Sequence, residues 1–179
     1  SQIFEASLPS GGNVKVNFEA KDALECDNRA WKVVDPPQAR RILIVGRNNF
    51  FLERVFGSAP GTECAVIAPE AYRGTALEGL FAVVWNGVPV PEVAPCNNIY
   101  LGCCPRVPGL LLGDKVDAPD IVDWNTSHPV NRFLDFDNLL IASASMLSLP
   151  DQAVTVLRSS RTPLIGLFES DQGGTCIVA

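Results

Sequence analysis

The sequence predicts an open α/β sheet with a parallel core and an antiparallel extension, preceded by an N-terminal β-hairpin. Up to Gly102, short continuous apolar runs alternate with segments of helical spacing, which is typical of parallel strands buried on both faces. After Gly102, strand-like runs follow one another with little room for helices. The chain has 179 residues, of which 47% are hydrophobic, so it can bury a core of its own.

Residues 1–35 are predicted to form the hairpin and the start of a linker. Val14 to Phe18 alternates apolar and polar residues, the period of a half-buried strand, and a second strand ends at Val34. Pro36 and Pro37 end that strand and stiffen the connection. Because a lone hairpin is marginal in water, we expect it either to pack on residues 36–179 or to close a β-sandwich whose other strands lie elsewhere.

The parallel core of residues 36–179 is predicted from four apolar runs. A helix is expected over Phe51 to Phe56, with Asn48 or Asn49 as its N-cap, and a shorter one between Pro69 and Leu77. The four strands are expected at Arg41–Gly46, Cys64–Ile67, Leu80–Gly87 and Asn98–Gly102.

The antiparallel extension is predicted from five later runs. A hairpin turn is expected over residues 170–174, before the last of them. The last run reaches Ala179, which favours the interpretation that the domain is truncated before further elements. The five runs are Ile121–Trp124, Leu139–Ala144, Ala153–Leu157, Pro163–Phe168 and Thr175–Ala179.

Charge excludes two classes of partner. The net charge is −6 and the sequence pI is about 4.7, which disfavours nucleic acid and anionic membrane surfaces, since both are bound by basic patches.

No apolar run approaches the roughly 18 residues that cross a bilayer, and the N-terminal residues lack the features of a signal peptide. This stretch is therefore not expected to span a membrane itself.

Short motifs occur in a characteristic order along nearly the whole chain. They are Asp22-Ala23-Leu24, Asp27-Asn28-Arg29-Ala30, Arg41-Ile42-Leu43-Ile44-Val45, Phe51-Leu52-Glu53, Val88-Pro89, Pro105-Arg106-Val107-Pro108-Gly109-Leu110, Val122-Asp123-Trp124 and His128-Pro129-Val130. In this order they resemble the aerotolerance-type (Bat-like) bacterial membrane proteins, which carry a von Willebrand factor A domain, a β-sandwich and a domain similar to class I glutamine amidotransferases.

The resemblance implies both a fold and a setting. Residues 1–34 would be the end of the sandwich, and residues 38–179 a flavodoxin-like, amidotransferase-like domain. The parent protein would be anchored in a membrane by helices outside this sequence, with this domain on the extracytoplasmic side.

Cys103 and Cys104 are the candidate nucleophiles. In amidotransferase-like domains a cysteine stands on a tight turn after a central strand, between two glycines, where a helix N-terminus favours the thiolate. Gly102-Cys103-Cys104-Pro105 occupies that place, but the second glycine is missing and Pro105 disturbs the helix entry. The alternative is a pair of ordinary loop cysteines.

A cysteine nucleophile needs a base, and the related enzymes take it from a late His-x-Glu motif. His128 is the single histidine, it lies in an earlier loop, and that motif is absent. We therefore predict that the chain has no catalytic residues. We expect a non-catalytic module that binds protein partners or has a structural role in a membrane-associated assembly. The alternative is a thiol-dependent amidohydrolase or amidotransferase-like enzyme that uses Cys103 or Cys104, with His128 as base.

No metal ion or cofactor is predicted. The six cysteines include no Cys-x-x-Cys pair, and the aspartates at 114, 117, 120 and 123 do not have the alternate spacing of a calcium loop. No phosphate-binding loop follows the first core strand, where Gly46-Arg47-Asn48-Asn49 stands instead. Those asparagines occupy the usual ligand crevice of an open sheet, or simply cap the helix.

Overall fold

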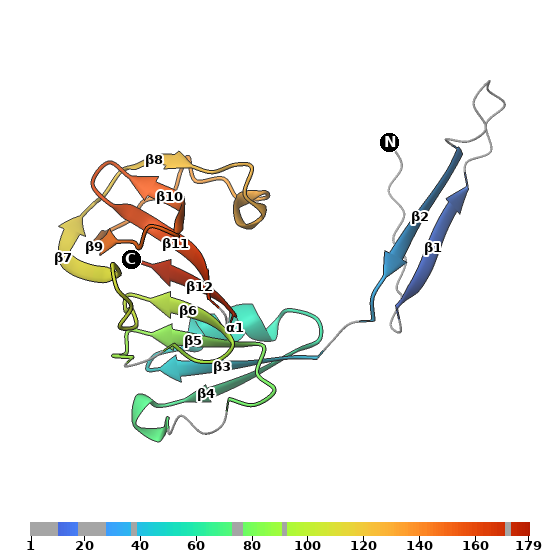
Figure 1. Cartoon of the computed structure of the whole chain (residues 1–179), viewed down its shortest axis with the longest axis horizontal. Helices are drawn as coiled ribbons and strands as arrows, with labels where there is room; N and C mark the ends of the chain where they lie inside the picture. The colour runs from blue at the N-terminus through green and yellow to red at the C-terminus, as the bar shows by residue number, and fades with distance from the viewer. Residues whose placement is uncertain (1–10, 18–27, 37–38, 73–76, 91–92, 171–172) are drawn as a thin grey trace. The chain divides into compact units, whose positions relative to one another are not determined.

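The computed structural model describes residues 11–17, 28–36, 39–72, 77–90, 93–170 and 173–179 (Figure 1). The chain forms two compact units, Ser1–Ala39 and Arg40–Ala179. In the first unit, β1 (Gly12–Asn17) and β2 (Arg29–Val34) form an antiparallel hairpin in which Gly12 pairs with Val34 and Asn17 with Arg29. Most of the predicted connection between these strands lies outside the described residues.

The second unit is built on a mixed open sheet, as predicted. Among the described residues it has eight strands in the order β4-β3-β5-β6-β12-β11-β10-β8. The strands are β3 (Arg40–Gly46), β4 (Thr62–Ile67), β5 (Ala82–Asn86), β6 (Asn97–Leu101), β8 (Ile121–Trp124), β10 (Val154–Ser159), β11 (Pro163–Ser170) and β12 (Gly173–Val178). Pairing is parallel from β4 to β12 and antiparallel from β12 to β8, so the predicted parallel core and antiparallel extension are confirmed.

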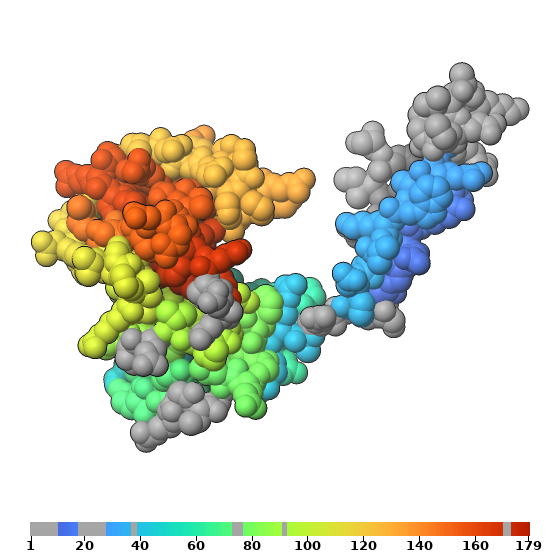
Figure 2. Space-filling view, in the orientation of Figure 1, coloured from blue at the N-terminus to red at the C-terminus, as the bar shows by residue number. Residues whose placement is uncertain are grey.

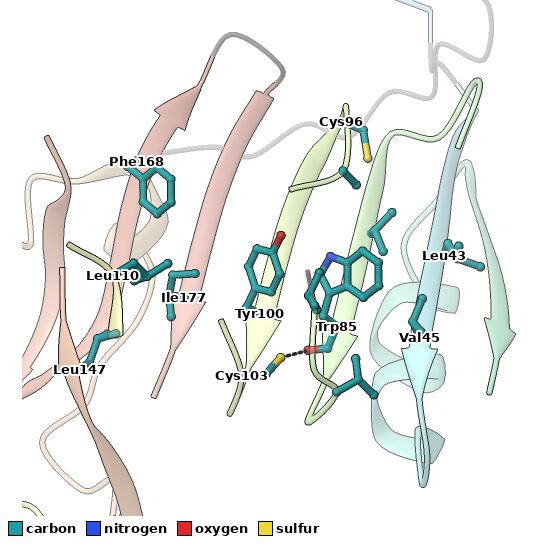
Figure 3. Close-up of a cluster of buried hydrophobic side chains, with 14 residues drawn as sticks. Leu43, Val45, Trp85, Cys96, Tyr100, Cys103, Leu110, Leu147, Phe168 and Ile177 are labelled. Atoms are coloured by element: carbon teal, nitrogen blue, oxygen red, sulfur yellow. Dashed lines mark hydrogen bonds between the residues drawn. The ribbon is translucent and has the colours of Figure 1, made fainter. Parts of the chain in front are cut away.

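Side chains on both faces of β3 and β5 are buried, which explains the continuous apolar runs of these two strands. On one face Ile42, Ile44, Ala82 and Val84 pack under helix α1 (Phe50–Gly57), which contributes Leu52 and Phe56. The opposite face carries a larger cluster that includes Leu43, Val45, Val83, Trp85, Tyr100 and Ile177 (Figure 3). Helix α1 is the one α-helix in the described part of the chain, and it is as predicted apart from the side chain of its N-cap.

Two predicted elements differ in the structure. The strand predicted at Leu139–Ala144 begins four residues later, as β9 (Ser143–Ser148). It pairs with β7 (Leu111–Asp117), a strand that the sequence did not indicate. Strand β7 carries three charged residues because most of its side chains face solvent. The predicted helix after Pro69 is a short 3₁₀ helix, η2 (Pro69–Ala71), and residues 73–76 lie outside the description. A second 3₁₀ helix, η3 (Pro129–Asn131), follows His128.

Within the described residues, no helix combines the length and the apolar character needed to pass through a bilayer.

Candidate functional site

The carboxyl ends of β3, β5 and β6 meet at one edge of the sheet, where open α/β folds commonly bind ligands. The chain leaves β3 at Gly46, and a Cβ atom there would lie 2.8 Å from the Cβ of Asn86, so the close approach requires glycine. The chain leaves β6 at Gly102, whose φ of 60° favours glycine. Both turns are therefore tight, as a nucleophile turn would need to be.

The side chains of the asparagines at this edge bind the loop and do not bond to the free amides of the helix. The Asn49 side chain makes no capping bond; its Nδ2 donates to the Gly46 carbonyl at 2.9 Å. Asn86 Nδ2 donates to Asn49 Oδ1 at 2.9 Å and to the Arg47 carbonyl at 3.2 Å. Asn49 is the N-cap residue of α1, which is one of the two predicted positions, but its side chain is buried in this network and makes no capping bond. Asn48 adopts a left-handed φ of 58°.

Cys103 lies at the predicted place after β6, but its thiol points into the core (Figure 3). It is 9% exposed, and its Sγ donates to the Trp85 carbonyl at 3.3 Å. Burial raises the pKa of the Cys103 thiol, because a thiolate would be poorly solvated there. Turns, not a helix, follow Pro105, so a helix N-terminus does not favour the thiolate.

A buried polar network centred on Asn98 joins two aromatic side chains to the loop before β6. Asn98 Oδ1 accepts hydrogen bonds from Trp85 Nε1 at 3.0 Å and from the Tyr100 hydroxyl at 3.3 Å. Its Nδ2 donates to the carbonyls of Ala94 and Cys96, at 3.0 and 2.7 Å. Trp85 and Tyr100 stack with their ring centroids 6.1 Å apart, and burial raises the pKa of Tyr100. Every polar atom of the Asn98 side chain is satisfied within the protein, so this network fastens the loop before β6.

His128 lies elsewhere, on the wall of a cavity of about 590 Å³. This cavity is lined by Asn97, Asn98 and Ile99 of β6, whereas Cys103 follows the other end of that strand. His128 Nδ1 accepts a hydrogen bond from the Val130 amide at 3.3 Å, and none of the described hydrogen bonds joins His128 to Cys103 or Cys104. The structure therefore does not bring together the three candidate catalytic residues.

The cavity is a site that the sequence did not indicate. Its lining comes from four strands, the loop before β10 and His128, so no local motif marks it. It is lined by His128, Gln152, Val154, Leu167, Phe168, Glu169, Gly174, Thr175 and Cys176 in addition to the three residues of β6. Burial raises the pKa of the Cys176 thiol to about 11, so this cysteine is neutral near pH 7.

No group of three or more His, Cys, Asp or Glu side chains in the described ranges could hold a metal ion. Asp114 and Asp117 lie in β7 and Asp123 in β8. Cys64, Cys96, Cys103, Cys104 and Cys176 are free thiols, and Cys26 lies outside the description.

No protein-family model matches this chain, and no curated protein matches its sequence. Several solved structures are similar in fold, and two of them are from Salmonella typhimurium. The "Cytoplasmic Protein STM3548 from Salmonella typhimurium" superposes with a TM-score of 0.56 at 11% identity, and the "Cytoplasmic Protein STM1381 from Salmonella typhimurium LT2" with a TM-score of 0.57 at 9% identity. Each alignment covers 94% of this chain and 84% of the other. At such identities the likeness shows the fold alone, a mixed open α/β sheet.

Proposed function

We propose that this chain is a non-catalytic module that binds another protein within a membrane-anchored assembly. The observation that carries the proposal is an apolar surface between η3 and β9. Phe133 is 89% exposed and Leu140 is 94% exposed, and the exposure of Leu134 and Leu139 is about half. In Figure 2 the orange segment that contains these residues stands out from the surface of the domain.

This apolar segment is anchored rather than loosely attached. The Phe136 ring packs edge-on against Trp124, with centroids 5.9 Å apart. Asn131 Nδ2 donates to the Val156 carbonyl of β10 at 2.7 Å and to the Asn125 carbonyl at 3.0 Å. Large apolar side chains held outward on a fixed segment are typical of protein interaction sites.

The cysteine geometry supports a function without catalysis. The thiol of Cys103 is bonded to a backbone carbonyl in the core, and its raised pKa keeps it protonated near neutral pH. A thiol nucleophile would instead need a nearby base or another group that lowers its pKa. The membrane-anchored parent with a von Willebrand factor A domain is supported by the order of sequence motifs, and it remains part of the proposal.

Site-specific photo-crosslinking in the full-length natural protein tests the binding function. A photoreactive phenylalanine analogue placed at Leu140 should give a discrete crosslinked product, and mass spectrometry should identify the captured protein or domain. The control position is Val66 on β4, at the opposite edge of the sheet and 39% exposed. Equal labelling from both positions, or none from Leu140, would contradict the proposal.

A glutamine hydrolysis assay tests the absence of catalysis. The wild-type protein and the variants Cys103→Ser and Cys104→Ser should all release no more ammonia from glutamine than buffer alone. Ammonia release that Cys103→Ser or Cys104→Ser abolishes would instead establish the thiol enzyme.

A further inference from the structure

We propose that a second cavity, beside β8, takes an arginine side chain of the protein partner. This inference rests on the proposed binding function and names the group by which the partner is recognised. The cavity has a volume of about 410 Å³, and ligand pockets commonly measure about 300–1,000 Å³. It borders the apolar surface and shares Leu139 and Leu140 with it, so a partner that covers the surface also reaches the cavity.

Two aromatic rings line this cavity. Trp124 belongs to β8, the last strand in the order of the sheet (Figure 1), and Phe136 belongs to the segment that follows η3. The two ring planes are 68° apart, so the rings meet edge-on instead of stacking, and ring faces are left for other contacts. Cations bind over the faces of aromatic rings, and arginine does so more often than lysine.

The charged side chains that line the cavity are both acidic. They are Asp120, in the loop before β8, and Asp137, next to Phe136, and both are exposed. Neither carboxylate has an ion-pair or hydrogen-bond partner among the described residues. An aromatic and apolar cavity with two free carboxylates is complementary to a cation that has a flat apolar face.

The surroundings of the cavity are acidic as well. Residues 117–141 hold five aspartates and one arginine, which is a net charge of −4 out of −6 for the whole chain, with His128 neutral. The arginine of this stretch, Arg132, lies over the Phe133 ring at 5.4 Å. From the neighbouring strand β10, Arg158 stands opposite Asp123 and lines a separate cavity with it. The two carboxylates of the proposed site therefore remain available to a partner.

Backbone hydrogen bonds hold the rim of the cavity in place. The Ala118 amide donates to the Ala142 carbonyl at 2.9 Å, which joins the two ends of the segment that lines the cavity. The Ser160 amide donates to the Asp120 carbonyl at 3.1 Å, which fastens the loop before β8 to the end of β10. A site that is already formed loses less conformational freedom when its partner binds.

Arginine fits this cavity better than lysine does. Its guanidinium group is flat, stacks on aromatic rings, and is less strongly hydrated than an ammonium group. Its N–H groups also form paired hydrogen bonds with carboxylates. Lysine brings the same charge without the flat face, so we expect it to bind about threefold more weakly.

The probe is a capped pentapeptide with an arginine between two leucines and a glycine at each end. Added to the ¹⁵N-labelled 179-residue chain, it should shift the indole N–H signal of Trp124 in NMR spectra until the site is saturated. The chain has two other tryptophans, Trp31 on β2 and Trp85, whose indole N–H is bonded to Asn98 in the core, and their signals should not move. The matched control peptide has citrulline in place of arginine, which keeps the shape and removes the charge. It should bind about fivefold more weakly.

Two double variants locate the binding. Asp120→Asn with Asp137→Asn should weaken the arginine peptide about fivefold and leave the affinity of the citrulline peptide unchanged. The matched control is Asp114→Asn with Asp151→Asn, which removes the same charge from two exposed aspartates that do not line the cavity. It should change the affinity by less than about twofold.

The outcomes separate this inference from the proposed function. Equal binding of the arginine peptide and of the citrulline or lysine peptide, equal weakening by both double variants, or no saturable shift would overturn the arginine site, even where Leu140 crosslinks to a protein. N-acetyl-arginine amide that binds as tightly as the pentapeptide would indicate a small-molecule site and would also overturn it. Absence of the Leu140 crosslink, with charge-selective binding of the peptide retained, would contradict the proposed function instead.

Discussion

Single buried polar side chains hold the loops of this domain in place. Asn98 connects two aromatic rings to the loop before β6, and Asn131 fastens η3 to β10. Thr162 Oγ1 accepts a hydrogen bond from the Leu147 amide at 2.7 Å, which connects β9 to the turn before β11. Asn131 and Thr162 connect segments that are 25 and 15 residues apart, and Asn98 reaches Trp85 on the neighbouring strand, so these roles could not be deduced from adjacent residues alone.

Asn98→Leu should destabilise the second unit by about 3 kcal/mol, because it leaves buried donors and acceptors without partners. The indole N–H of Trp85 would lose its acceptor, and the Ala94 and Cys96 carbonyls would lose their donor. Urea unfolding followed by Trp fluorescence measures the effect. Asn138→Leu, at an exposed position, is the control and should change the free energy of unfolding by less than about 0.5 kcal/mol. Similar values for both variants would show that the network contributes little.

Alkaline pH should weaken the fold through its buried thiols. Burial raises the pKa of Cys176 to about 11, above that of a thiol in the unfolded chain, so the folded state binds the proton more tightly. Its contribution to stability is therefore complete below the unfolded pKa and is lost as pH rises toward 11. Cys176→Ala should make the fall in unfolding free energy between about pH 8.5 and 11 less steep. Parallel curves for the two proteins would refute this.

The candidate nucleophile illustrates how far sequence reasoning reaches at this scale. The position of Cys103 after β6 could be predicted, because an apolar run followed by glycine indicates a strand and a turn. The direction of its thiol could not, since that depends on the Trp85 carbonyl of a neighbouring strand. The place of His128 likewise depends on a cavity built from four strands.

Among the secondary-structure elements, those buried on both faces were the most predictable. Strands β3 and β5 have continuous apolar runs because each face meets a separate cluster of core residues. Among the described residues strand β7 pairs with β9 alone and is largely exposed, so its sequence is too polar to indicate a strand. The apolar run Leu139–Ala144 predicted a strand that begins too early, because Leu139 and Leu140 are exposed and precede β9, whereas Ile141 packs against a core cluster.

Helix α1 offers a matched pair of phenylalanines. Phe56 packs on the sheet, so Phe56→Ala should lower the free energy of unfolding by about 2 kcal/mol. Phe51 is 78% exposed, and Phe51→Ala should change the free energy of unfolding by less than about 0.5 kcal/mol. Chemical denaturation compares the two. A large loss from Phe51→Ala would contradict the exposed position of this side chain.

At the scale of the whole molecule, the hairpin and the sheet domain are separate compact units. Trp31 and Val33 on β2 are 65% and 72% exposed, so the described hairpin buries little apolar surface of its own. The core, by contrast, lies within residues 40–179, where its buried clusters are found. Most of the stability of this chain is therefore expected to come from the sheet domain.

Deletion of residues 1–39 should leave a single cooperative unfolding transition, with a midpoint within about 3 °C of that of the full chain. Differential scanning calorimetry measures both. Loss of cooperative unfolding on this deletion would show that the hairpin belongs to the main core.

Strand β12 is the last strand in chain order, yet it lies between β6 and β11. While a ribosome makes the protein, β6 and β11 therefore both present unpaired backbone edges until β12 has emerged. At a synthesis rate of ~5–20 residues per second, the interval between Leu101 and Val178 lasts roughly 4–15 s. For most of this time the nascent chain holds the sheet β4-β3-β5-β6 with the backbone edge of β6 unpaired, which makes it a natural client for chaperones that act at the exit tunnel.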